Sequence, residues 1–215
     1  MCGITGFTGR QPALPFLLQG LSKLEYRGYD SAGVTLVNSK KLRTWKTKGR
    51  LKELEKLLNR DLEQSCGIGH TRWATHGVPS NMNAHPHMNE DDTISVVHNG
   101  IVENYAELKE ELKEKGYIFH SETDSEVIVQ LLDYYYRQKP VMKDALVKTV
   151  KRLEGSYAIC VTSILSGEGI GFDSAEGMSP TLVMLQHQCV KGTGSMPATD
   201  RSRPEPPFSL SLCFL

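Results

Sequence analysis

The chain has 215 residues, 39% of them hydrophobic, and its 25 basic and 25 acidic residues give no formal net charge. This length suits one globular domain, and a neutral chain gives no electrostatic reason to expect nucleic acid or an anionic membrane as a partner. Because no apolar run reaches the ~18 residues of a membrane span and the first residues lack a secretory signal pattern, we expect a cytoplasmic protein.

The first elements indicate a sheet with helices packed on it. Residues 3–7 form a short apolar run typical of a strand, and leucines three or four positions apart predict a helix over 12–28. Alternating residues predict a hairpin with arms over 32–39 and 41–47. Residues 49–63 have the pattern of an amphipathic helix with a solvated charged face.

Strands and helices follow in mixed order. We expect strands over residues 66–72, 93–100 and 156–165, and helices over residues 102–116, 121–138 and 143–155. Ser121 or Thr123 is expected to cap the middle one of these helices. The mixed order favours packed sheets flanked by helices over a doubly wound nucleotide-binding fold.

The composition changes near Ser163. Residues 164–215 are rich in Gly, Ser and Pro and keep neither a helical nor a strand period. We therefore expect a domain over 1–163 and a divergent, poorly ordered tail over 164–215, with the hypothesis that this tail is a frame-shifted or prematurely terminated reading.

The cysteines are typical of reduced thiols, because their number is odd and their spacing contains no CxxC pair: Cys2, Cys66, Cys160, Cys189 and Cys213. Removal of Met1 would leave Cys2 with a thiol of pKa ~8.5 beside an α-amino group of pKa ~8. The amine can then accept the thiol proton, so Cys2 is a candidate nucleophile. The alternative is a frayed terminus without function.

Polar residues cluster where predicted strands and helices end. In LEYRGYDSAG, Arg27 beside Asp30 is either functional or a surface ion pair. In GHTRWATHG, the guanidinium of Arg72 suits a carboxylate, and Thr75 and His76 add donors. The alternative for this region is a metal site that uses nearby histidines and a carboxylate: His70, His76, His85, His87, His98 and Asp124.

Two further clusters leave their interpretation open. In VVHNGIVEN, the amide of Asn99 and the backbone N–H of Gly100 are the two types of donor that an oxyanion hole uses. Alternatively, the Asn-Gly dipeptide forms only a turn between two elements. In SETDSE, Asp124 either caps the following helix or binds a substrate ammonium. Together, Arg72 and Asp124 would recognise a free amino acid.

The chain contains six motifs whose identity and order together resemble the glutaminase domain of the glutamine–fructose-6-phosphate aminotransferase family: MCGITGF, LEYRGYDSAG, GHTRWATHG, NAHPH, VVHNGIVEN and SETDSE. The resemblance implies an α+β, N-terminal nucleophile hydrolase fold. We expect a four-layer α/β/β/α sandwich of two stacked, mostly antiparallel sheets, with an incomplete C-terminal part. The sugar isomerase domains of the family are absent from these 215 residues.

The resemblance also implies a mechanism without metal or other cofactor. Cys2 would attack the side-chain amide of L-glutamine, release ammonia for amino-sugar synthesis, and leave a thioester that water hydrolyses. The implied roles are oxyanion donors for Asn99 and Gly100, substrate contacts for Arg72, Trp73, Thr75, His76 and Asp124, and support of the nucleophile loop for Arg27.

Two other functional hypotheses remain open at this stage. The first is a catalytically inactive, truncated fragment of such an enzyme, and the second is a metal-dependent hydrolase that uses the histidines. The full-length enzymes of the family are homo-oligomers, and the isomerase domains expected to drive association are missing here. We expect L-glutamine as the partner, with no nucleic acid and no membrane.

Overall fold

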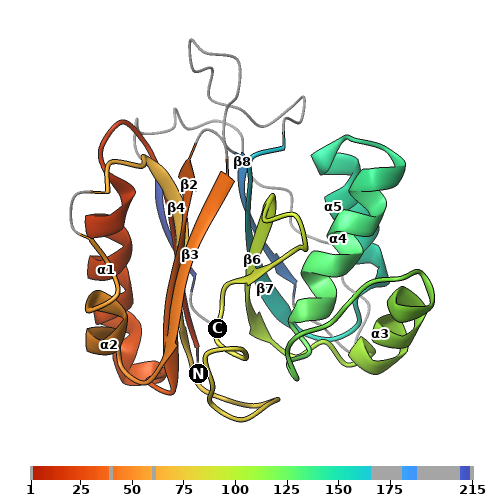
Figure 1. The fold of residues 1–215 in the computed structure, drawn as a ribbon, viewed down its shortest axis with the longest axis horizontal. Coiled ribbons are helices and arrows are strands. Elements are labelled where there is room, and N and C mark those ends of the chain that lie inside the picture. Colours follow the sequence, from red (N-terminus) through yellow and green to blue (C-terminus); the bar gives the residue numbers. More distant parts are fainter. Residues whose placement is uncertain (1, 39–40, 60–61, 166–180, 188–208, 214–215) are drawn as a thin grey trace.

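The computed structural model describes residues 2–38, 41–59, 62–165, 181–187 and 209–213. These residues form four layers, with helices α1 and α2 on one outer side, two stacked sheets in the middle, and helices α3, α4 and α5 on the other side (Figure 1). Every strand pairing is antiparallel. The predicted α/β/β/α sandwich of an N-terminal nucleophile hydrolase is confirmed.

The first sheet has the strand order β3-β2-β4-β1-β9. Its strands are β1 (Gly3–Thr8), β2 (Ser31–Asn38), β3 (Lys41–Lys48), β4 (Cys66–Arg72) and β9 (Ser209–Cys213). Strands β2 and β3 form the predicted hairpin. Because β1 lies antiparallel to β4 with Gly3 opposite Thr71, the start of the chain comes beside the end of β4.

The second sheet has the order β5-β6-β7-β8. Its strands are β5 (His87–Met88), β6 (Ile94–Gly100), β7 (Tyr157–Ser163) and β8 (Thr181–His187). The short strand β5 was not predicted, because two residues are too few to show a periodic pattern. It places the His-Pro-His segment at the edge of this sheet.

The helices differ from their predicted lengths mainly at their ends. They are α1 (Ala13–Leu24), α2 (Leu51–Glu55), α3 (Tyr105–Glu114), α4 (Glu126–Gln138) and α5 (Met142–Arg152), and a 3₁₀ turn η1 (Glu25–Arg27) follows α1. The prediction of a long helix over 49–63 was wrong, since α2 ends at Glu55. Leu51 and Leu54 of α2 are buried, and Leu58 beyond the end of the helix packs against the same apolar cluster.

The predicted cap of α4 was also wrong. The residue before the helix is Ser125, and no side chain caps the helix there. Instead, the carboxylate of Glu126 reaches back to accept hydrogen bonds from the backbone N–H groups of His120 and Ser121 at 2.9 and 2.6 Å. Glu126 therefore fixes the loop that leads into α4.

Three apolar clusters fill the spaces between the layers. The space between the two sheets holds Ile4, Ile68, Val97, Ala158 and Cys160. Leucines of α1 and α2 pack on the outside of the first sheet, and α3, α4 and α5 cover the second sheet. Within the described residues, Cys66 and Cys160 are buried cysteines that form no disulfide, as predicted.

The region after Ser163, for which we expect a poorly ordered tail, contributes two strands to the described structure. Strand β8 pairs with β7, and strand β9 pairs with β1. Both sheets therefore gain a strand from this region, because the backbones of β7 and β1 offer unpaired groups on those sides. Residues 166–180, 188–208 and 214–215 lie outside the described residues, and the domain boundary at 163 stays a prediction.

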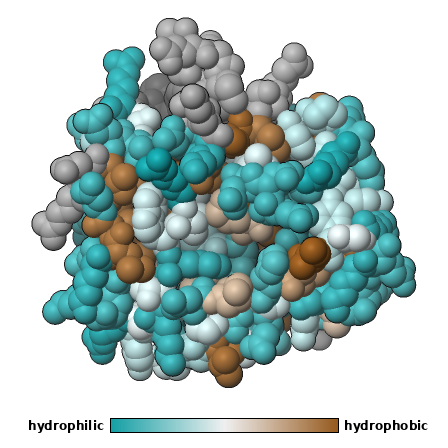
Figure 2. All heavy atoms as spheres, in the orientation of Figure 1, coloured by the Kyte–Doolittle hydropathy of each residue, from teal (hydrophilic) through white to brown (hydrophobic). Residues whose placement is uncertain are grey.

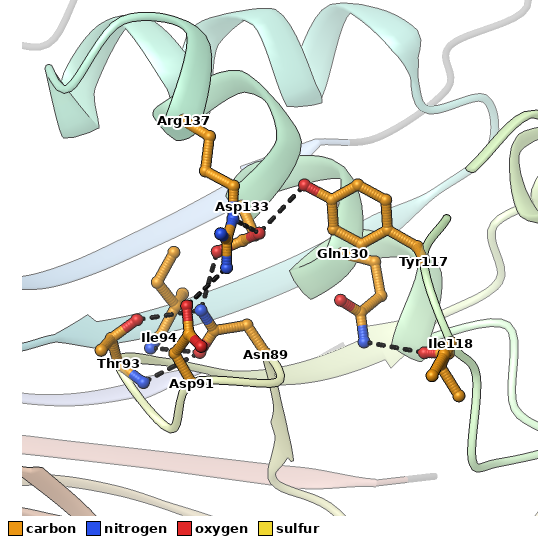
Figure 3. Close-up of polar contacts among 9 residues, drawn as sticks. All are labelled: Asn89, Asp91, Thr93, Ile94, Tyr117, Ile118, Gln130, Asp133 and Arg137. Carbon is orange, nitrogen blue, oxygen red and sulfur yellow. Dashed lines mark hydrogen bonds and ion pairs between the residues drawn. The ribbon is translucent and has the colours of Figure 1, made fainter. Parts of the chain in front are cut away.

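A buried carboxylate attaches the turn between β5 and β6 to α4 (Figure 3). Asp133 accepts hydrogen bonds from Asn89 Nδ2 at 2.7 Å, Tyr117 Oη at 3.0 Å and Arg137 Nε at 2.5 Å. Arg137 also contacts Asp91 at 2.5 Å. Asn89 completes the turn, because its Oδ1 accepts the N–H groups of Thr93 and Ile94.

The face of the molecule in Figure 2 is largely hydrophilic, with apolar residues in small, separate groups. In the ranges that the structure describes, no helix is both long and apolar enough to cross a membrane.

Candidate active site

The ends of three strands and the start of one helix meet at a pocket of about 300 Å³. Cys2 precedes β1, Arg72 ends β4, Asn99 and Gly100 end β6, and Asp124 precedes α4. The lining residues are Cys2, Arg72, Trp73, Thr75, His85, His98, Asn99, Gly100, Ile101, Thr123, Asp124 and Ser125. Residues from distant parts of the sequence thus meet at one point, as an active site requires.

The thiol of Cys2 is held by the backbone of Trp73. The Trp73 N–H donates to Cys2 Sγ at 3.2 Å, and Sγ lies 3.5 Å from the Trp73 carbonyl oxygen. Burial raises the pKa of the Cys2 thiol, while the Trp73 N–H and the charge of Arg72 act in the opposite direction. A thiol in this setting needs a neighbouring base to become a nucleophile.

Asn99 has a fixed orientation beside Cys2. Its Nδ2 donates to the backbone carbonyl of Cys2 at 3.1 Å, and its Oδ1 lies 2.8 Å from His70 Nε2. Gly100 follows with a φ of +119°, and a Cβ at this position would stand 2.2 Å from the carbonyl oxygen of Ser156. Only glycine fits this backbone.

Arg72 is a buried cation with spare donor capacity. Its Nη2 donates to the carbonyl oxygens of His76 and Gly77. Its Nη1 is buried and has no hydrogen-bond partner among the described residues. A buried, unpaired guanidinium nitrogen in a pocket wall is costly unless a ligand occupies it.

Asp124 is a buried carboxylate in the same pocket. Its Oδ2 accepts the backbone N–H of Val102 at 2.9 Å, and the hydroxyl of Ser125 lies 3.4 Å from Oδ1. Asp124 thus binds the backbone that follows β6, and it does not cap the first turn of α4. Ser125 also contacts His98 Nδ1 at 2.7 Å.

The RGYDSAG segment shapes the loop that carries Trp73. Asp30 Oδ2 accepts the N–H of Ala74 at 2.9 Å, and the N–H of Asp30 donates to the Arg72 carbonyl. A Cβ on Gly28 would stand 2.8 and 2.9 Å from backbone atoms of Arg72 and Trp73. We had not assigned this role to Asp30, because sequence spacing cannot show which distant loop a side chain contacts.

Two predicted site residues lie apart from the pocket wall. His76 packs against the ring of Tyr105, with 5.6 Å between ring centroids, and only its carbonyl contacts Arg72 in the bonds described. Arg27 Nε donates to the hydroxyl of Tyr26 at 2.7 Å. The roles predicted for these two residues therefore stay predictions.

The histidines of the metal hypothesis contact one another and nearby polar groups. His70 stacks on His85 with 4.2 Å between ring centroids, and His87 Nε2 lies 3.0 Å from the hydroxyl of Thr123. Within the described ranges, no group of three His, Cys, Asp or Glu side chains is arranged to hold a metal ion.

Comparison with known families agrees with this geometry. A profile of the glutamine amidotransferase domain matches residues 70–187, which is more than half of the chain. The chain belongs to this family. The matched region runs past residue 163 to residue 187 and includes β8.

Curated relatives of this glutamine amidotransferase domain are much longer than the chain. The glutamine–fructose-6-phosphate aminotransferase (isomerizing) of Clostridium acetobutylicum is 57% identical over 164 residues, which cover 76% of the chain and 27% of the relative. The enzyme of that name from Staphylococcus epidermidis is 54% identical over 202 residues, which cover 86% of the chain and 33% of the relative. The chain thus spans about a quarter to a third of these relatives.

Solved structures give the same picture of the fold. The glutamine phosphoribosylpyrophosphate amidotransferase of B. subtilis, solved with ADP and GMP, superposes with a TM-score of 0.66 at 27% identity, over 75% of the chain and 35% of that protein. The structure of an allosteric regulatory enzyme of purine biosynthesis superposes with the same TM-score and identity, over 79% of the chain and 38% of that protein.

Proposed function

We propose that this domain hydrolyses the side-chain amide of L-glutamine to glutamate and ammonia, with Cys2 as the nucleophile. One observation carries the proposal: a thiol, an oriented amide, an unpaired guanidinium nitrogen and a carboxylate line a single pocket. The last two groups suit the α-carboxylate and α-ammonium of a free amino acid, while the first two suit its side-chain amide.

The proposed reaction has two steps. After removal of Met1, the α-amino group of Cys2 accepts the thiol proton, and Sγ forms a bond to the amide carbon. The C–N bond then breaks, and the same proton leaves with the amide nitrogen as ammonia. Water hydrolyses the thioester to glutamate and regenerates the thiol. Two moderate barriers thus replace the one high barrier of amide hydrolysis.

The proposed oxyanion donors are Asn99 Nδ2 and the backbone N–H of Gly100. One hydrogen of Asn99 Nδ2 already bonds to the carbonyl of Cys2, which leaves the second hydrogen for the developing oxyanion. Such donors each contribute ~10² to 10³ in rate, because they are oriented before the charge forms.

Substrate binding is proposed to use opposite charges. Arg72 Nη1 would bind the α-carboxylate, with the hydroxyl of Thr75 and the loop of Trp73 beside it, and Asp124 would bind the α-ammonium. Both charged side chains are buried, at 4% and 3% exposure, so an ion pair with the substrate would be little screened by water. In this proposal His76 also contacts the substrate, and Arg27 supports the nucleophile loop. No cofactor or metal enters this chemistry.

We further propose that the ammonia serves an isomerizing aminotransferase reaction on fructose 6-phosphate, on the way to glucosamine 6-phosphate. The names and the identities above 50% of the curated relatives support this assignment. The sugar site, and any association into homo-oligomers, would belong to parts of the relatives that these 215 residues do not span. In the part of the chain that the structure describes, Cys2, Cys66 and Cys160 form no disulfide, which fits a reducing compartment such as the cytoplasm.

A glutaminase assay on the purified 215-residue chain tests the proposal. We expect glutamate release by the wild-type chain, loss of at least ~10³-fold in kcat for Cys2→Ala, and no effect of a metal chelator. The control Cys66→Ala alters a buried thiol away from the pocket and should retain activity if folded. Chelator-sensitive turnover that survives in Cys2→Ala would support a metal hydrolase. A folded but inactive chain would support the inactive fragment.

A further inference from the structure

His70 joins the two sheets directly behind the pocket. It lies on β4 of the first sheet, and its Nε2 contacts two groups of β6 in the second sheet. These are the carbonyl oxygen of His98 at 3.1 Å and Oδ1 of Asn99 at 2.8 Å. The ring is fully buried and stacks on His85 at an interplanar angle of 16°. His70 is not itself part of the pocket wall.

The protonation of His70 follows from its partners. A backbone carbonyl oxygen only accepts hydrogen bonds, and so does the amide oxygen of Asn99. Nε2 must therefore carry the hydrogen. Nδ1 is buried without a hydrogen-bond partner among the described residues, as suits a nitrogen without a hydrogen. Burial lowers the pKa of His70 to about 3, so the ring is neutral at physiological pH.

The orientation of the Asn99 amide follows from both of its ends. Nδ2 faces the carbonyl oxygen of Cys2, which can only accept. If the amide were flipped, its oxygen would face this carbonyl oxygen, and the His70 hydrogen would have to leave Nε2 and expose a lone pair to the His98 carbonyl. Both contacts would be repulsive. A single arrangement therefore satisfies all four groups.

We propose that His70 is a positioning residue for glutamine hydrolysis, which holds the Asn99 amide so that its free N–H points at the oxyanion. This inference rests on the proposed function of the site. Without the His70 donor, Asn99 keeps only its bond to Cys2 and can rotate about its terminal torsion. The oxyanion donor would then no longer be oriented before reaction, and the loss would appear in kcat and not in substrate binding.

A matched pair of substitutions tests the proposal. In His70→Gln, the side-chain NH₂ lies about as far along the side chain as Nε2 does in histidine, so the donor is retained. His70→Met fills a similar volume without a donor. We expect His70→Met to lower kcat ~10²-fold with KM changed less than ~3-fold, and His70→Gln to recover most of this loss. Equal losses in both variants, or a loss confined to KM, would overturn the proposal.

A double-mutant cycle separates positioning from general destabilisation. In an Asn99→Ala background the group that His70 orients is absent, so His70→Met should cause little further loss in kcat. If the two losses instead multiply, His70 acts independently of Asn99 and the proposal fails. Far-ultraviolet circular dichroism and urea unfolding of each variant verify that the compared proteins are folded.

A spectroscopic measurement tests the hydrogen bond from His70 to Asn99 even if the chain shows no turnover. ¹⁵N-detected correlation spectra of the wild-type chain should show neutral His70 in the Nε2–H tautomer at pH 7. The Asn99 side-chain amide resonances should shift in His70→Met and stay closer to their wild-type positions in His70→Gln, which keeps the donor. The Nδ1–H tautomer, or unchanged Asn99 resonances, would contradict the inference. Loss of wild-type activity with the expected spectra would overturn only the proposed function.

Discussion

Asp30 and Ala74 are joined across the site, with 2.9 Å between the carboxylate oxygen Oδ2 and the backbone nitrogen. This bond fixes the loop whose Trp73 N–H contacts the Cys2 thiol. A carboxylate in a loop of the first sheet thereby determines where the nucleophile stands.

We therefore expect Asp30→Ala to impair the domain through this loop. Loss of one such hydrogen bond costs about 1 kcal/mol, which corresponds to a ~5-fold lower kcat/KM for glutamine. Asp30→Asn keeps an oxygen that can accept the Ala74 N–H and should stay near wild-type activity. Steady-state kinetics of both variants test this, and equal activity of Asp30→Ala and wild type would disprove the anchoring role.

Gly100 is expected to tolerate no side chain. Its φ of +119° is unfavourable for other residues, and a Cβ would stand 2.2 Å from the Ser156 carbonyl oxygen. Gly100→Ala should therefore lower both the unfolding free energy and the glutaminase rate, the latter by ~100-fold.

Gly116 provides the control for this substitution. It also has a positive φ, of +89°, but a Cβ there would meet nothing within 4 Å. Gly116→Ala should cost only the backbone strain of about 1 kcal/mol and leave the rate unchanged. If urea unfolding gives the same loss for both alanine variants, the steric argument for Gly100 is wrong.

The buried Asp133 should contribute more to stability than its exposed neighbour Asp91. Asp133→Ala leaves Asn89, Tyr117 and Arg137 without their shared acceptor, which should lower the unfolding free energy by about 2 kcal/mol. Asp91→Ala removes a partner of Arg137 whose side chain is 58% exposed, and should change the unfolding free energy by less than about 0.5 kcal/mol. Urea unfolding at pH 7 measures both values, and the reverse order would contradict the arrangement in Figure 3.

Buried histidines should make the domain sensitive to acid. Burial lowers the pKa of His70 to about 3 and of His98 to about 4, below the value of 6.5 for an unperturbed histidine. Between these values the unfolded chain binds more protons than the folded one, so stability falls as the pH drops below 6.5. Each histidine adds a slope of up to about 1.4 kcal/mol per pH unit.

Urea unfolding from pH 8 to pH 4.5 tests this dependence. A stability that stays constant down to pH 4.5 would show that the buried histidines gain no protons on unfolding, contrary to the structure.

Much of the site could be predicted from the sequence because its motifs lie at the ends of regular elements. Periodicity placed β4, β6 and α4, and with them Arg72, Asn99 and Asp124, all of which line the pocket. The contacts between distant segments could not be predicted. The bond from Asp30 to Ala74 and the bond from His70 to Asn99 depend on how the hairpin and the two sheets pack, and no local pattern encodes that packing.

Local sequence patterns did not show two features of the fold. Residues 49–63 carry a helical pattern, yet α2 ends at Glu55, and Leu58 packs against the apolar cluster of the first sheet from the segment that follows the helix. The region after Ser163 contains too many glycines and prolines for a clear period, and β8 and β9 form there through pairing with strands far away in the sequence.

The most direct test of the account is intact-mass spectrometry of the chain before and after treatment with an electrophilic glutamine analogue. We predict a chain that lacks Met1 and gains a single adduct, which peptide mapping assigns to Cys2 and which excess glutamine suppresses. An unmodified Cys2 in a chain whose other thiols react freely would show that the pocket does not bind glutamine next to this thiol, and would contradict the proposed mechanism.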